Sequence, residues 1–91
     1  MQARDRRDRH EMERYFFDVD DGGLKVDSEG KMLMGADAVA EAAMNRLFES
    51  AKVEVVTNNE REVAVTVRNG EGEPVYRASL TVRAGWLVGR R

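Results

Sequence analysis

An acidic stretch between Asp18 and Glu29 contains the residue types that come closest to a metal site. Asp18, Asp20, Gly23 and Glu29 fall at loop positions 1, 3, 6 and 12 of a calcium-binding EF-hand. Position 5 is a glycine, however, position 8 is a lysine, and the preceding residues have the pattern of a strand where an EF-hand requires a helix. We therefore interpret these acids as turn residues that accept local backbone hydrogen bonds, and we predict no metal site.

Side-chain catalysis needs a nucleophile, a base and an orienting group close together, or paired carboxylates in a cleft. The sequence contains no cysteine, and its one histidine, His10, lies in a charged N-terminal stretch. Its serines, Ser28, Ser50 and Ser79, are scattered along the chain. We predict that the protein is not an enzyme and has no catalytic residues and no cofactor. The absence of cysteine also excludes a disulfide framework.

Arginines beside an aromatic ring form a third candidate site, because some sheet proteins hold single-stranded nucleic acid by stacking and Arg contacts. Outward Arg and Thr are, however, normal on the solvated face of an antiparallel sheet, and the sequence lacks the second helix of an RNA recognition motif. We therefore favour an interaction face for protein and keep nucleic acid as the alternative. The residues of this face are Phe16, Thr66, Arg68, Val75, Arg77, Thr81 and Arg83.

The composition is that of one small globular domain. A chain of 91 residues has room for one core, and 42% hydrophobic with 35% charged residues is ordinary for a folded protein. No run approaches the roughly 20 apolar residues of a membrane span, and the Arg- and Asp-rich start differs from a signal peptide. We predict a cytoplasmic protein that does not associate with membranes.

Charge is distributed unevenly behind a net charge of -2. Residues 15–60 carry four basic and ten acidic residues, whereas residues 61–91 carry six Arg and three acidic residues. Residues 1–14 mix five Arg with four acids, which weakens the attraction of this segment for phosphate. The asymmetry favours contact between oppositely charged faces, within one molecule or between copies.

The first half of the chain predicts a hairpin followed by a helix. Residues 14–19 alternate as a strand, an Asp-Asp-Gly-Gly turn follows, and residues 24–26 return. Residues 31–34 either extend the sheet or lead into the helix. Apolar residues spaced by three and four then predict one amphipathic helix from Gly35 or Ala36 to about Lys52, with an apolar stripe that Met44 and Phe48 widen.

The second half predicts another hairpin. Residues 53–56 fit either the end of the helix or a short strand, whereas residues 62–68 and 74–83 alternate clearly and are joined by a Gly-containing turn. The predicted fold is therefore α+β, of order ββαββ, with a four-stranded, mostly antiparallel sheet and the helix on one face. Its predicted core consists of Tyr15, Phe17, Val19, Leu24, Val26, Val39, Ala43, Leu47, Val63, Val65, Val67, Tyr76, Leu80 and Val82.

Several quoted segments together resemble a family of short bacterial proteins of unknown function that open with Met-x-Arg-Tyr-Phe-Phe-Asp. The matching segments are Arg14-Tyr15-Phe16-Phe17-Asp18-Val19, Asp21-Gly22, Asp27-x-Glu29-Gly30 and the Ala-rich helix with Glu41-Ala42. The resemblance covers roughly residues 12–83, and it departs at Met34-Gly35, where relatives often have Pro-Asp. It implies the same domain limits and no assigned activity.

We divide the chain into a charged, disordered tail (residues 1–11), one domain (residues 12–84) and a C-terminal extension (residues 85–91). The expected function is that of a protein-interaction or accessory domain. The alternative is a nucleic-acid-binding regulator or an antitoxin of the HicB type, on analogy of layout alone. We expect a homodimer formed through the uncovered sheet face or an edge strand; in a monomer, Trp86, Leu87 and Val88 would fold back and cover Phe16.

Overall fold

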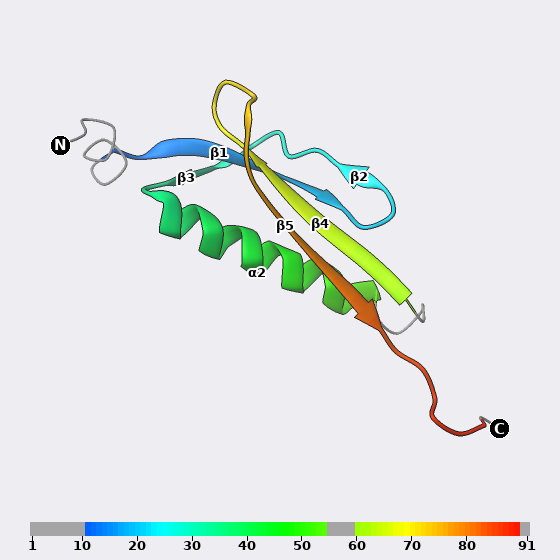
Figure 1. Ribbon diagram of the computed structural model, residues 1–91. Coiled ribbons are helices and arrows are strands. Elements are labelled where there is room, and N and C mark those ends of the chain that lie inside the picture. Colours follow the sequence, from blue (N-terminus) through cyan, green and yellow to red (C-terminus); the bar gives the residue numbers. More distant parts are fainter. Residues whose placement is uncertain (1–10, 55–59, 90–91) are drawn as a thin grey trace.

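A computed structural model describes residues 11–54 and 60–89 of the chain (Figure 1). The helix α2 lies along one face of an antiparallel sheet whose strand order is β2-β1-β4-β5, and β3 also pairs with β1. This arrangement confirms the predicted α+β class. The elements in chain order are β1 (Glu13–Asp20), β2 (Leu24–Lys25), β3 (Lys31–Leu33), α2 (Ala36–Glu54), β4 (Glu60–Arg68) and β5 (Pro74–Arg83).

The core lies between the sheet and α2, because side chains alternate between the two faces along each strand. Phe17 pairs with Val67 and Val19 with Val65, so both pairs share the face that α2 covers. The buried hydrophobic cluster consists of Phe17, Val19, Val39, Ala43, Leu47, Ala51, Val63, Val65 and Val67. Tyr15, Leu80 and Val82, also predicted for the core, pack against it while partly buried.

The helix α2 presents its predicted apolar stripe to the sheet. Ala43 and Leu47 are almost fully buried, and α2 contacts β4 and β5 more than it contacts β1. Its first turn follows Gly35, which has a φ of 88°, a conformation that favours glycine. Asp37 in the first turn and Lys52 in the last turn have the signs that suit the helix dipole.

Three residues of the predicted core are exposed instead. Leu24 and Val26 are 66% and 64% exposed, because β2 has two residues and lies on the far side of β1 from the strands that α2 covers. Tyr76 is 37% exposed because it lies at the start of the outermost strand, β5. Phe48, expected to widen the buried stripe, is 52% exposed on the flank of α2.

One small side chain on the uncovered face of the sheet is buried. Ala64 lies on the central strand β4 and pairs with Asp20 on one side and Ser79 on the other. It is only 5% exposed, because its methyl group is short and both neighbouring strands carry larger side chains beside it. The uncovered face of a sheet can therefore bury a small side chain without a second layer.

The segments that the sequence left open are settled in part. Residues 31–33 form β3, and the helix continues through Val53 to Glu54, while Val55 and Val56 lie outside the described residues. The predicted tail also lies outside them, apart from Glu11. The C-terminal segment does not fold back over Phe16: Trp86, Leu87 and Val88 run away from the sheet and are 75%, 100% and 75% exposed (Figure 1).

Candidate functional site

One edge of the sheet is an interrupted strand. β2 and β3 pair with opposite ends of β1, at Val19 with Lys25 and at Tyr15 with Lys31. Between these two pairs, β1 spans four residue steps (from 19 back to 15), whereas the returning chain takes six steps (from 25 to 31). The two surplus residues force the chain out of the ladder between β2 and β3. The backbone groups left unpaired there need other partners.

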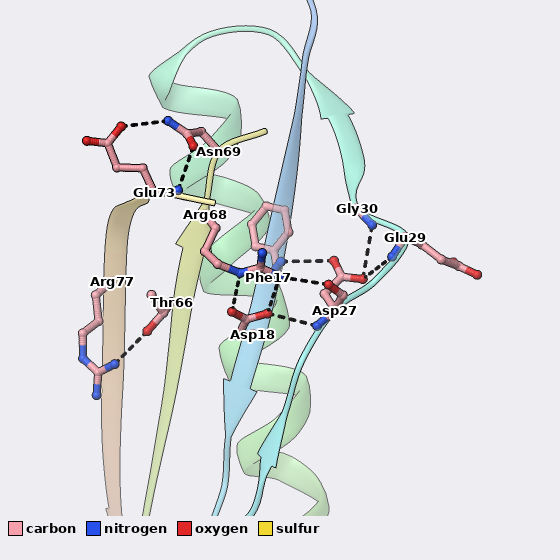
Figure 2. A network of polar contacts seen from close by, with 10 residues as sticks. All are labelled: Phe17, Asp18, Asp27, Glu29, Gly30, Thr66, Arg68, Asn69, Glu73 and Arg77. Carbon is pink, nitrogen blue, oxygen red and sulfur yellow. Dashed lines mark hydrogen bonds and ion pairs between the residues drawn. The ribbon is translucent and has the colours of Figure 1, made fainter. Parts of the chain in front are cut away.

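The carboxylate of Asp27 supplies those partners. Its Oδ2 accepts a hydrogen bond from the N–H of Phe17 at 3.1 Å, on the strand that the loop leaves unpaired. Its Oδ1 accepts from the N–H groups of Glu29 at 3.1 Å and Gly30 at 3.2 Å, within its own loop (Figure 2). A single side chain therefore replaces the missing ladder contact and shapes the loop.

Arg68, on β4, connects this loop to the sheet from the other side of β1. Its Nε donates to Oδ2 of Asp18 at 2.6 Å, and one terminal nitrogen donates to Oδ1 of Asp18 at 3.1 Å and to the Asp27 carbonyl at 3.0 Å. The Asp27 N–H donates to Asp18 at 2.9 Å. Figure 2 shows the three side chains converging from β4, β1 and the loop. Such a two-pronged contact is geometrically specific.

The two aspartates of this network are held in their ionised form. The hydrogen bond from Arg68 is the main cause that lowers the pKa of Asp18. Burial by itself would raise the pKa of Asp27, but the N–H groups of Phe17, Gly30 and Glu29, with the charge of Arg46, bring its pKa below the ordinary value. Both carboxylates therefore accept hydrogen bonds from groups of the protein itself, and these contacts stabilise the fold.

Phe16 and Gly30 complete the closed edge. The guanidinium carbon of Arg68 lies 5.0 Å from the centre of the Phe16 ring, within the range of a cation–π contact. Gly30 has a φ of 73°, and a Cβ there would lie 2.9 Å from the Tyr15 carbonyl oxygen and 3.0 Å from the Phe16 ring. Only glycine therefore fits where the loop rejoins the strand.

The opposite edge of the sheet is open. β5 has ten residues, and no strand among the described residues pairs with its outer side. Its register against β4 shifts at Val75, after which Tyr76 to Arg83 pair regularly. Arg77 donates to the Thr66 hydroxyl at 2.7 Å, and Arg83 lies 3.6 Å from a Glu60 carboxylate oxygen.

The residues of the predicted interaction face lie in three groups. Phe16 and Arg68 belong to the network at the closed edge, and Thr66 is the acceptor for Arg77 on the face between the edges. Val75, Thr81 and Arg83 lie exposed on β5. The sequence did not indicate the role of Asp27. The Asp27-x-Glu29-Gly30 pattern was the available signal, but it identified only a turn.

A cavity of about 290 Å³ lies beside the start of β5. It is bounded by Glu13 and Tyr15 of β1, Ala36 and Val39 of α2, Asn69 of the β4–β5 turn, and Val75 and Tyr76 of β5. This volume is near the lower limit of small-molecule sites, so it suits one bulky side chain better than a whole ligand. Within residues 11–54 and 60–89, no group of three or more His, Cys, Asp or Glu side chains is placed to hold a metal ion.

A family model described as Domain of unknown function (DUF6894) matches residues 14–81. No curated protein and no solved structure matches the sequence. No helix in the described part of the chain is both long and apolar enough to cross a membrane.

Proposed function

We propose that this chain, which belongs to the DUF6894 family of unknown function, is a non-enzymatic protein-interaction domain that binds an extended segment along the outer edge of β5. The observation that carries the proposal is the difference between the two edges. Asp27 and Arg68 close one edge with side-chain contacts, whereas no strand in the described part of the chain pairs with the ten residues of the other. Strand addition to an exposed sheet edge is a common mode of peptide recognition.

The sequence of β5 supports an edge that can pair with an added strand. Proteins usually protect an exposed edge with charged side chains (lysine above all), proline, a β-bulge, an inward-pointing charge or a very short strand. β5 contains no lysine, its proline and its register shift are confined to its first two residues, and the residues on its helix-facing side are uncharged. Those residues are Tyr76, Ala78, Leu80 and Val82.

The arginines of the open face are already engaged within the domain. Arg68 binds Asp18, Arg77 binds Thr66, and Arg83 lies beside Glu60. A phosphate group of a nucleic acid would have to compete with each of these contacts. The geometry therefore favours a protein segment as the ligand over the nucleic acid of the alternative hypothesis. We propose that the domain acts in the cytoplasm of a bacterium, as its sequence suggests.

A library of displayed twelve-residue peptides tests the proposal, with the domain fixed to a surface at low density so that single copies present their edges. Leu80→Pro and Thr81→Pro are compared with the parent. Consecutive residues of a strand direct their N–H groups to opposite sides, so one of the two prolines removes only an outward donor and leaves the β4 ladder intact.

We expect enriched peptides to bind the parent and to bind the folded proline variant at least tenfold more weakly, while Gly89→Pro, outside the sheet, binds like the parent. Circular dichroism identifies which strand variant remains folded. Equal binding by that variant contradicts the proposal. Salt-dependent binding of a single-stranded DNA or RNA probe by the parent, with no peptide enriched, supports the nucleic-acid alternative instead.

A further inference from the structure

We infer that the extended segment bound by β5 is β5 of a second copy, and that Trp86 of each copy fills the cavity beside the start of the other copy's β5. The inference rests on the proposed function and adds the partner and the register. The two strands run antiparallel about a two-fold axis at Ser79, which joins the sheets of both copies with both helices on the same side.

The register follows from the residues that would face each other. With Ser79 opposite itself, Arg77 faces Thr81 on the open side of the sheet. A two-fold axis at Leu80 would instead place Arg77 of each copy opposite Arg83 of the other, and these like charges would repel each other. A centre at Ala78 brings Pro74, which has no N–H, into the ladder. A two-fold axis on Ser79 therefore pairs residues 76–82 without opposing like charges.

The helix-facing side of this pairing is apolar throughout. The same register places Ala78 opposite Leu80 and Tyr76 opposite Val82. Tyr76 is 37% exposed, and Leu80 and Val82 are only partly buried in the single chain. Aromatic and β-branched cross-strand pairs stabilise antiparallel sheets, so the second copy would remove from water the surface that β5 leaves uncovered.

One flank of α2 extends this apolar surface. Arg46 and Ser50 line a second cavity together with residues of β1 and β2, so that flank faces the closed edge. Met44 and Phe48 are four residues apart on the opposite flank, on the β5 side, and Phe48 is 52% exposed. In the paired sheet, Met44 and Phe48 of the two helices would face each other across the axis.

The C-terminal segment reaches the cavity in the same register. Val75 and Tyr76 line the cavity of about 290 Å³, and Tyr76 lies opposite Val82 of the second copy in this register. Trp86 follows Arg83 by three residues, or about 10 Å of extended chain, which carries its side chain past Pro74 of the second copy to that cavity. Trp86 is 75% exposed in the single chain, and Tyr15, Val39 and Tyr76 contribute the apolar part of a cavity lining that also includes Glu13 and Asn69.

Charge around the cavity complements the incoming segment. Glu13 lines the cavity, and Glu71 and Glu73 lie in the adjacent β4–β5 turn. The segment that would enter is preceded by Arg83 and followed by Arg90 and Arg91 in the sequence. Each copy therefore offers a basic end to an acidic end of the other, as the uneven charge of the sequence suggests.

A single cysteine tests the register, because the chain has no cysteine of its own. Ser79→Cys places two thiols opposite each other at the axis, at a separation that a disulfide spans. We expect most of this variant to form a linked dimer on mild oxidation. Thr81→Cys alone should remain unlinked, whereas a mixture of Thr81→Cys with Arg77→Cys should link. Linking of Thr81→Cys in preference to Ser79→Cys overturns the register.

Light scattering and fluorescence test the assembly and the cavity. We expect the parent to dimerise with rising concentration and the emission of Trp86, the one tryptophan in the chain, to shift to the blue at the same time. Trp86→Ala should weaken dimerisation about tenfold or more. A dimer whose Trp86 emission does not shift overturns the seating of Trp86.

Failure of this inference is distinguishable from failure of the proposed function. A parent that stays monomeric at every concentration overturns the pairing of two copies. If that monomer still enriches displayed peptides, the edge binds a segment of another protein and the proposed function stands. If it enriches none, both are wrong.

Discussion

The two edges of the sheet differ in how their backbone groups are used. At the β1 edge the returning chain is too long to pair throughout, and Asp27 and Arg68 supply the missing contacts from side chains. At the β5 edge the strand is long and pairs regularly from Tyr76 onward, yet no described strand pairs with its outer side. An irregular edge can thus be closed within one chain, while a regular edge is left available to another.

The largest effect should come from the core that both edges share. Leu47 is 1% exposed at the centre of the α2 stripe, so Leu47→Ala should lower the free energy of unfolding by about 2 to 5 kcal/mol. Glu49→Ala, on the exposed side of α2, is the control and should change it by less than about 0.5 kcal/mol. Urea unfolding followed by circular dichroism measures both. Equal effects of the two variants would place Leu47 outside the core.

A smaller effect, confined to one edge, should follow from Asp27→Ala. The change leaves the N–H groups of Phe17, Glu29 and Gly30 without their acceptor, at a cost of about 1 to 3 kcal/mol. Asp21→Ala is the matched control, since the Asp21 ion pair with the exposed Lys25 should contribute at most about 1 kcal/mol. Amide exchange should accelerate in β2 and β3 before β5. Acceleration at β5 first would show that the edges are not independent.

The stability that the closed edge contributes to the fold should also depend on pH. Because the pKa values of Asp18 and Asp27 lie below the ordinary value, both carboxylates stabilise the fold above about pH 4. This stabilisation should disappear as pH falls through the lowered values of the folded state. Asp27→Asn should therefore be less stable than the parent at pH 7, and the difference should shrink below about pH 4. A difference that stays constant down to pH 2 would contradict this account.

The smallest effect on folding should come from the open edge. Thr81 is exposed on the uncovered face of β5, so Thr81→Lys should change the free energy of unfolding of the monomer by less than about 0.5 kcal/mol. The same change opposes the new lysine to Arg77 of a second copy and should weaken dimerisation. Thr81→Val serves as the uncharged control. A large loss of monomer stability would show that the β5 edge is already used within the chain.

The sequence predicted the local parts of this fold and missed the parts set by strand order. Alternation placed Val63, Val65 and Val67 correctly, and the spacing of three and four placed Leu47, because both depend on neighbours in the chain. Leu24 and Val26 alternate equally well, but which strands the helix covers is a property of the whole sheet.

The candidate site shows the same limit. Arg68 was predicted as an outward residue, and its contacts with Asp18 and Asp27 join residues 50 and 41 positions apart. No local sequence pattern predicts contacts between residues so far apart in the chain. The open edge likewise follows from strand order, which places β5 outermost, whereas its alternating sequence would equally suit a central strand.

Amide hydrogen exchange at several protein concentrations tests the contrast between the edges most directly. We predict that the outward-facing amides of β5, between Val75 and Arg83, exchange more slowly as the concentration rises, while the amides of β2 and β3 exchange at a constant rate. Rates in β5 that do not change with concentration, or protection that appears at β2 and β3 instead, would contradict the account.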